Sequence, residues 1–419
     1  MRGLYQTDDN MIEIKSDFSG SIPGRYRIKW ANIYMAMREE TATQSDGKTH
    51  DYSCHFAFDL KNSGNTSESL YISFGCESVE EEMVYDALLY AAENTQNEFH
   101  RLKIFSKTDT FKKYHIPLTL EAGQTLYIAN FYYRSHERLQ KLFEYLAGMG
   151  KAVRVPNGKS IGCREFSCYR YGEPSSESLN VMISSGFHFP EGDTIATEKI
   201  MEHLSLPENR KKYADTVFHV IPKVNPDGFF YGYNGCNHAG FNLYWEFDEN
   251  DTEKCPEVHY LWQYCLMARP NHYFDFHSYI FQLHRKKAFP YVKPLYFYQG
   301  ALVRDKALEI SRDLMAFCRG KQVCSFSTYA PSVLATKLTW VFNTVTFAKY
   351  HFALFDGIRE SADLALKSFE AAMQHLQGMK AADWQKKDNL SWHFFRELMR
   401  IWVYQVRPFL VKVKNRIIN

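Results

Sequence analysis

Several features that would assign a chain to a familiar class are missing from this sequence of 419 residues. No stretch approaches the ~18 consecutive apolar residues that cross a membrane. The first residues, MRGLYQTDDNMIEIKSD, are polar and acidic, so we expect no secretory signal. The nine cysteines form no Cys-x-x-Cys pair, and their odd number favours reduced, buried thiols and a cytoplasmic location. Net charge is only +2, which argues against a nucleic-acid partner.

What is present indicates an ordered globular chain of two or three domains. Hydrophobic residues make up 45% of the chain, which is enough to bury a core, and aromatic residues make up 16%. Residues 1–150 predict short strands between polar turns, followed by a helix. The expected strands are Tyr52–Leu60, Leu70–Phe74, Tyr114–Leu120 and 125–133, and the expected helix is Ser135–Met149.

From residue 151 the pattern changes to an alternation of strands and helices. The expected strands are Leu179–Ser185, Thr216–Pro222, His272–His277 and Trp340–Tyr350, and the expected helices are Thr194–Leu204, Ala301–Cys318 and Ser361–Leu376. Such alternation predicts an α/β domain with a largely parallel or mixed sheet. Functional residues of such domains gather at the carboxyl ends of the strands, where the loops face a crevice.

Residues 379–419 carry nine cations and three anions, with seven aromatic residues between them. A basic aromatic helix of this kind can make a weak contact with a membrane surface or a partner protein. The alternative is a terminal helix whose aromatic side chains pack on the body of the protein while its cations stay in water. The pattern does not predict an oligomeric state.

One His-x-x-Glu occurs in the chain, at His188–Glu191, between an expected strand and an expected helix. An imidazole and a carboxylate on one turn can bind the same cation, and Zn²⁺ accepts nitrogen and oxygen ligands. A catalytic zinc site needs a third protein ligand, and Asp275-Phe-His277 offers one at the end of another strand. Alone, the spacing is weak, because 16 histidines make one such match unsurprising.

The order of motifs is more specific. The series HFPE, NPDG, GFNLYW, DFHSY and TFA resembles the M14 zinc metallocarboxypeptidases, especially the cytosolic-carboxypeptidase-like branch, over about residues 155–378. The resemblance implies a carboxypeptidase-like mixed sheet flanked by helices (151–378), preceded by a small β-rich domain (1–150) and followed by a helical segment (379–419). It also implies that His188, Glu191 and His277 bind Zn²⁺. Asp275 could orient a neighbouring group or make a turn hydrogen bond.

The chain departs from the family at its general base. The family uses a late-strand glutamate to move a proton, and in this chain Ala348 takes that position, or Thr346 if the alignment slips by two residues. Neither side chain accepts a proton near neutral pH, and proton transfer contributes about 10²–10⁴-fold to the rate of such reactions. We therefore expect the chain as written to be nearly inactive. It is either a natural pseudoenzyme or a variant engineered to lack its glutamate, and the intact metal trio favours the second.

The family's clamp for a substrate carboxylate is also replaced. Its Asn-Arg pair falls on Tyr244 and Trp245, and Asn242, which takes the place of its aspartate, is a further candidate for substrate binding. Tyr244 and Trp245 are predicted either to form an aromatic wall for the substrate or to belong to the core. Arg285, in the run HRKK, is a candidate replacement cation. Tyr329 falls near the family's mobile tyrosine and could donate to an oxyanion, or it could be a surface residue.

These features predict a zinc-dependent hydrolase of a peptide or amide bond, acting on a peptide-like or amino-acid-conjugate substrate. One alternative is a carboxypeptidase that removes C-terminal residues from peptides or proteins, with Arg285 as its clamp. The other is a catalytically inactive protein that binds peptides or a partner through the retained groove. A glutamate at the position of Ala348 in homologues would favour an enzyme over a binding protein.

Overall fold

The computed structural model describes most of the chain up to residue 385. The described residues are 3–6, 11–21, 26–29, 31–35, 40–43, 49–52, 55–75, 89–95, 97–102, 113–247, 251–279, 289–291, 309–310, 313, 333–342, 344–353 and 358–385. Within these ranges, none of the helices is both long enough and apolar enough to cross a membrane.

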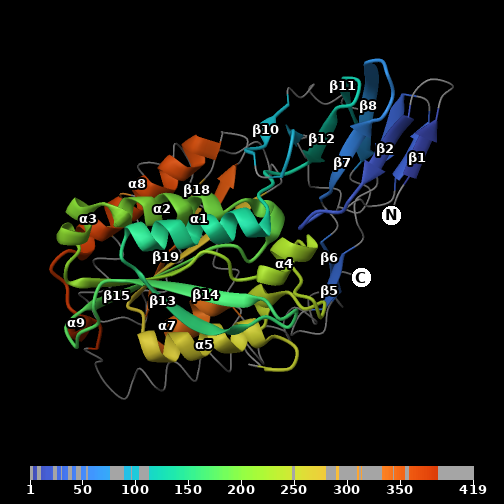
Figure 1. The fold of residues 1–419 in the computed structure, drawn as a ribbon. Coiled ribbons are helices and arrows are strands. Elements are labelled where there is room, and N and C mark those ends of the chain that lie inside the picture. Colours follow the sequence, from blue (N-terminus) through green and yellow to red (C-terminus); the bar gives the residue numbers. More distant parts are fainter. Residues whose placement is uncertain are drawn as a thin grey trace, which may run out of the picture.

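The N-terminal part is a small β-rich region, as the sequence predicts (Figure 1). Its six-stranded sheet has the order β1-β2-β7-β12-β9-β10, and its four-stranded sheet has the order β11-β8-β4-β3. A shared apolar cluster, including Ile14, Phe58, Ile72 and Ile128, joins the two sheets. A separate hairpin consists of β5 and β6. The strands are β1 (Gly3–Gln6), β2 (Met11–Lys15), β3 (Tyr26–Lys29), β4 (Asn32–Met35), β5 (Thr41–Thr43), β6 (Thr49–Asp51), β7 (Ala57–Asn62), β8 (Glu68–Gly75), β9 (Tyr90–Ala92), β10 (His100–Arg101), β11 (Lys113–Leu120) and β12 (Thr125–Ala129).

The second part is built on a mixed seven-stranded sheet with the order β13-β14-β16-β15-β17-β19-β18. The four strands β16, β15, β17 and β19 are parallel, while β13, β14 and β18 run antiparallel to their neighbours. The strands are β13 (Val153–Lys159), β14 (Glu165–Tyr171), β15 (Leu179–Ser184), β16 (Thr216–Ile221), β17 (His272–Tyr279), β18 (Phe289–Tyr291) and β19 (Val345–Ala353). The expected mixed α/β sheet is confirmed.

Helices cover both faces of this sheet (Figure 1). The helices are α1 (His136–Met149), α2 (Thr194–Ser205), α3 (Pro207–Lys212), α4 (Pro226–Tyr231), α5 (Pro256–Ala268), α7 (Leu334–Phe342), α8 (Ile358–Leu376) and α9 (Ala381–Gln385), with 3₁₀ turns η1 (Phe189–Glu191) and η2 (Leu243–Trp245). One apolar cluster joins α1, α2 and α8 to the sheet, and a second joins α5 and α7 to it. Helix α1 thus packs on the second sheet, through Phe143 and Leu146. The boundaries at residues 150 and 378 stay a prediction.

Several expected elements differ from the structure. The strand expected at Trp340–Tyr350 begins at Val345, because residues up to Phe342 belong to helix α7. A short apolar run is compatible with either element, and here Leu334, Leu338 and Phe342 repeat at helical spacing. The expected strand Tyr52–Leu60 begins only at Ala57. Helix α5 was not predicted. Most of the expected helix Ala301–Cys318 lies outside the described residues, as do residues 386–419.

The segment Asn-Pro-Asp-Gly, residues 225–228, starts helix α4. Asn225 caps the helix, since its side chain accepts from the backbone N–H of Gly228 at 2.9 Å. The buried carboxylate of Asp227 accepts hydrogen bonds from the Ser160 hydroxyl at 2.6 Å and the Gly162 amide at 2.9 Å. The motif therefore fastens the β13–β14 turn to the loop after β16, which is a structural role.

Candidate metal centre

The sequence-predicted trio lies at the carboxyl ends of two neighbouring parallel strands. Strand β15 pairs with β17 up to Ser184 and Asp275. His188 and Glu191 follow directly after β15, and His277 lies two residues beyond Asp275 on β17. This is the edge of an α/β sheet at which functional residues gather.

A tight loop positions His188 and Glu191. Gly186 has φ +72°, and a Cβ there would lie 2.9 Å from the Cα of Lys223, so only glycine fits. Glu191 closes the η1 turn by donating its backbone N–H to the carbonyl of His188 at 3.2 Å. Between them Phe189 is only 2% exposed and packs edge-on against Phe131 at 4.9 Å. The buried phenylalanine anchors the turn, so both polar side chains are held on the same side.

The three side chains converge in a geometry suited to a metal ion. Nδ1 of His188 lies 2.7 Å from Oε1 of Glu191, and Nδ1 of His277 lies 3.2 Å from Oε2 of the same carboxylate. The ligand atoms of all three lie within 4.8 Å of one another. His277 is 1% exposed, whereas the side chains of His188 and Glu191 are 13% and 14% exposed. Solvent therefore reaches the trio from one side.

The electrostatics of the trio favour a cation. Burial would raise the pKa of Glu191, but His188 and His277 outweigh this effect and hold the pKa of that carboxyl well below its usual range. Burial would lower the pKa of His277, but the carboxylates of Asp275 and Glu191 raise it to about 9. The two carboxylates beside this buried imidazole thus favour a positive charge on it. A metal ion bound to the trio would take the place of the proton that otherwise provides that charge. Two imidazoles and a carboxylate are the ligand types that zinc accepts.

The nitrogens that face away from the trio also have partners. Nε2 of His277 lies 3.0 Å from Oδ1 of Asp275, and Asp275 is 2% exposed. Nε2 of His188 lies 3.4 Å from Oδ1 of Asn242, which also accepts from the backbone N–H of Tyr244 at 3.1 Å. Such partners keep the proton on Nε2 and direct Nδ1 toward a metal. Asn242, predicted as a substrate-binding residue, therefore contacts the side of the His188 ring that faces away from the trio.

Two different replacements of Asn242 are expected to change the zinc affinity in opposite directions. Asn242→Ala removes the acceptor from His188 and should weaken zinc binding by about 10–100-fold. Asn242→Asp should strengthen it, because a carboxylate makes the imidazole a better ligand and the Nδ2 group that it replaces has no hydrogen-bond partner in the described residues. Competition titration against a chromophoric chelator measures both. Equal affinities for the two variants would contradict the role given to Asn242.

Of the two predicted aromatic wall residues, Tyr244 lies in the core and Trp245 is partly exposed. The Tyr244 ring is 3% exposed and contacts the His277 ring edge-on at 4.8 Å. Phe187 stacks on His277 at 5.5 Å and contacts Tyr244 edge-on at 5.5 Å. The two rings exclude water from the back of His277, which strengthens its interaction with the carboxylates.

The remaining predicted site residues are less fully described. Ala348 is on β19, where its backbone pairs with Phe274 of β17, one residue before Asp275. The general-base position is thus on the strand next to the one that carries His277. Arg285 and Tyr329 lie outside the described residues, so their roles stay predictions.

Tyr52 from the N-terminal region contacts the site and was not predicted. Its ring lies 6.4 Å from the ring of His188, at a tilt of 34°. Its backbone carbonyl accepts from Nδ2 of Asn234 at 3.0 Å. No sequence signal marks Tyr52, because it is more than 130 residues away from His188 and belongs to no motif.

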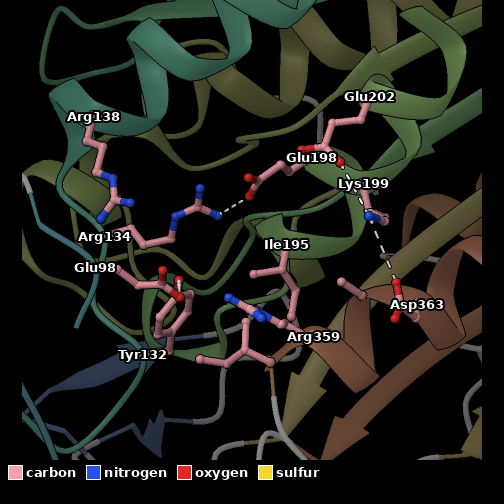
Figure 2. A pocket seen from close by; sticks show the side chains of 12 residues that line it. Glu98, Tyr132, Arg134, Arg138, Ile195, Glu198, Lys199, Glu202, Arg359 and Asp363 are labelled. Atoms are coloured by element: carbon pink, nitrogen blue, oxygen red, sulfur yellow. Dashed lines mark hydrogen bonds and ion pairs between the residues drawn. The ribbon is translucent and has the colours of Figure 1, made fainter. Parts of the chain in front are cut away.

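A separate cavity of about 360 Å³ lies between α1, α2 and α8 and contains none of the trio (Figure 2). Arg134, which is 5% exposed, pairs there with Glu198 at 2.5 Å, and Lys199 pairs with Glu202 at 3.5 Å. Four cations of the lining face four carboxylates, so the cavity has no excess charge. The lining residues are Glu98, Tyr132, Arg134, Arg138, Ile195, Glu198, Lys199, Glu202, Ile358, Arg359, Ala362 and Asp363.

Comparison with solved structures identifies a carboxypeptidase-like fold. A metallo-carboxypeptidase from Burkholderia cenocepacia matches 87% of this chain and 99% of its own with a TM-score of 0.72 and 19% identity. A metallo-carboxypeptidase from Pseudomonas aeruginosa, solved in complex with (2-guanidinoethylmercapto)succinic acid, matches 87% of this chain and 100% of its own with a TM-score of 0.71 and 18% identity. No protein-family model matches the chain. No curated protein sequence matches it either.

Proposed function

We propose that this chain is a zinc-dependent hydrolase of the M14 type that cleaves a peptide or amide bond in a peptide-like or amino-acid-conjugate substrate. The observation that carries the proposal is the convergence of His188, Glu191 and His277 within 4.8 Å at the carboxyl edge of a carboxypeptidase-like sheet. Two of the solved structures that this chain resembles in fold are bacterial metallo-carboxypeptidases.

Each residue of the site has a task in this proposal. His188, Glu191 and His277 hold the cation, while Asn242 and Asp275 keep the two Nδ1 atoms directed at it. A zinc ion bound there supplies Lewis acidity toward a carbonyl and toward water. The exposed side of His188 and Glu191 is the side from which a substrate enters. Ala348 cannot accept a proton, so the chain as written lacks the proton-transfer step.

A binding protein is the second candidate, and Ala348 is the observation that favours it. A retained metal trio without a general base can still bind a carbonyl or carboxylate group of a peptide. The carboxypeptidase alternative depends on a cation that binds the substrate carboxylate, and its candidate, Arg285, is outside the described residues.

Metal analysis followed by a substrate screen tests the proposal. We expect the purified protein to contain about one zinc ion per chain, removable by a chelator and restored by zinc addition. Because the chain as written lacks a general base, the zinc-loaded protein and its Ala348→Glu variant are both incubated with a mixed library of peptides and acyl-amino acids, and mass spectrometry reports any bond that is cut. Absence of bound zinc after zinc addition would overturn the proposal.

A further inference from the structure

The end of helix α4 and the loop after it are held by three groups from the N-terminal region. The backbone N–H of Gly20 donates to the carbonyl of Phe230 at 2.7 Å. Nε2 of His55, which is fully buried, lies 2.9 Å from the carbonyl of Gly232. The third and most extensive contact is made by Glu40. These contacts connect parts of the chain that are more than 170 residues apart in sequence.

The carboxylate of Glu40 binds three consecutive backbone amides. Its Oε2 accepts from Asn234 at 2.7 Å, and its Oε1 accepts from Gly235 at 2.9 Å and Cys236 at 3.2 Å. Three N–H groups directed at one carboxylate form a backbone nest for an anion. Glu40 is only 6% exposed, and while its burial raises its pKa, the three amides oppose that rise. Glu40 therefore fixes the backbone of residues 234–236.

This fixed segment is connected to the metal ligand His188 through Asn242. Cys236 forms a β-bridge with Asn242, and Asn242 supports Nε2 of His188 at 3.4 Å. Asn242 also packs closely on Gly235, since a Cβ at Gly235 would lie 3.0 Å from its Nδ2 atom. The connection thus runs from Glu40 through the 234–236 backbone to Asn242 and then to His188.

We propose that Glu40 is a positioning residue for the metal centre. By holding the amides of residues 234–236, it sets the place of Asn242 and so the orientation of His188. This inference rests on the proposed function, because it assumes that the trio binds a metal ion. It makes the N-terminal β-rich region a required part of the site and not an independent attachment.

The test uses Glu40→Gln and Glu40→Asp in the full-length chain. Glutamine keeps the size of the side chain but replaces one acceptor oxygen by an NH₂ group that opposes a backbone N–H, whereas aspartate keeps the charge. We expect Glu40→Gln to weaken zinc binding by about 10-fold, as loss of a ligand's supporting contact does, with partial recovery in Glu40→Asp. The visible spectrum of the cobalt-substituted protein should change as well, because it reports ligand geometry directly.

Two further variants separate positioning from simple loss of stability. Glu13→Gln is the matched control, since Glu13 is a carboxylate of the same region that pairs with Lys15 on the surface at 2.9 Å. It should leave the zinc affinity and the cobalt spectrum unchanged. Gly235→Ala pushes on Asn242 without altering Glu40, so it should shift the cobalt spectrum even if every Glu40 variant unfolds.

The possible failures are distinguishable. Wild-type zinc affinity and cobalt spectrum in folded Glu40→Gln would overturn the inference and leave the proposed function intact. An unchanged spectrum in Gly235→Ala would also count against the connection through Asn242. A wild-type chain that binds neither zinc nor cobalt would overturn the proposed function, and the inference with it.

Discussion

Replacing Glu191 with glutamine is expected to weaken zinc binding by on the order of 10³-fold. Zinc sites in proteins bind with about 10–16 kcal/mol, so each of three ligands contributes several kcal/mol. Glu191 contributes more than a ligand atom, because its carboxylate lies between two imidazoles and supplies the negative charge of the trio. Glutamine has nearly the same volume, so the surrounding η1 turn should remain folded.

Competition titration and elemental analysis of the purified variant measure this loss. His375→Gln is the matched control, since His375 also lies between two carboxylates, Asp313 at 2.6 Å and Glu309 at 3.3 Å, but is not in the trio. The control should bind zinc as the wild type does. Unchanged zinc affinity in Glu191→Gln would show that the ion binds elsewhere and would remove the basis of the proposed function.

Introducing glutamate at Ala348 is expected to raise the rate of hydrolysis by about 10²–10⁴-fold. The glutamate restores a group that can accept and return a proton on the strand next to β17, where Ala348 pairs with Phe274. The measurement is product formation from the mixed peptide and acyl-amino-acid library by the zinc-loaded variant. The mass of the product then identifies the bond that is cut.

Lys349→Glu is the control for this experiment. It places the same carboxylate one residue along β19, where the backbone pairs with Asp275. A rise in rate in Ala348→Glu and not in Lys349→Glu would assign the general base to position 348. If Ala348→Glu binds zinc and yet gives no product, the hydrolase proposal fails for every substrate in the library. That result would favour the alternative that the chain is a binding protein.

Local sequence patterns predicted most of the regular structure around the site. Helix α1 begins next to Ser135, as expected, because the Ser135 hydroxyl accepts from the N–H of Arg138 at 3.1 Å. Strands β15, β16 and β17 start at the expected residues. Where prediction failed, at Trp340–Tyr350, a short apolar run was compatible with both a helix and a strand, and the tertiary contacts of α7 decided between them.

The order of motifs predicted which residues could form the trio but not what supports it. The motif indicated a substrate-binding role for Asn242. Its contact with His188 was not predictable, because that contact depends on a loop whose path is set by Glu40. Tyr244 could have belonged to either a substrate wall or the core, and only the packing of Phe187 and Tyr244 around His277 places it in the core.

The sequence by itself indicated the candidate ligands, since the order of the motifs that contain His188, Glu191 and His277 marks them and each motif lies at the end of an expected strand. Only the tertiary structure decided that their ligand atoms meet, that Tyr52 lies beside His188 and that Glu40 holds the backbone of residues 234–236. The physical reason is that backbone pairing and capping act over a few residues, whereas a site is closed by contacts between distant segments. Such contacts leave no periodic trace in the sequence.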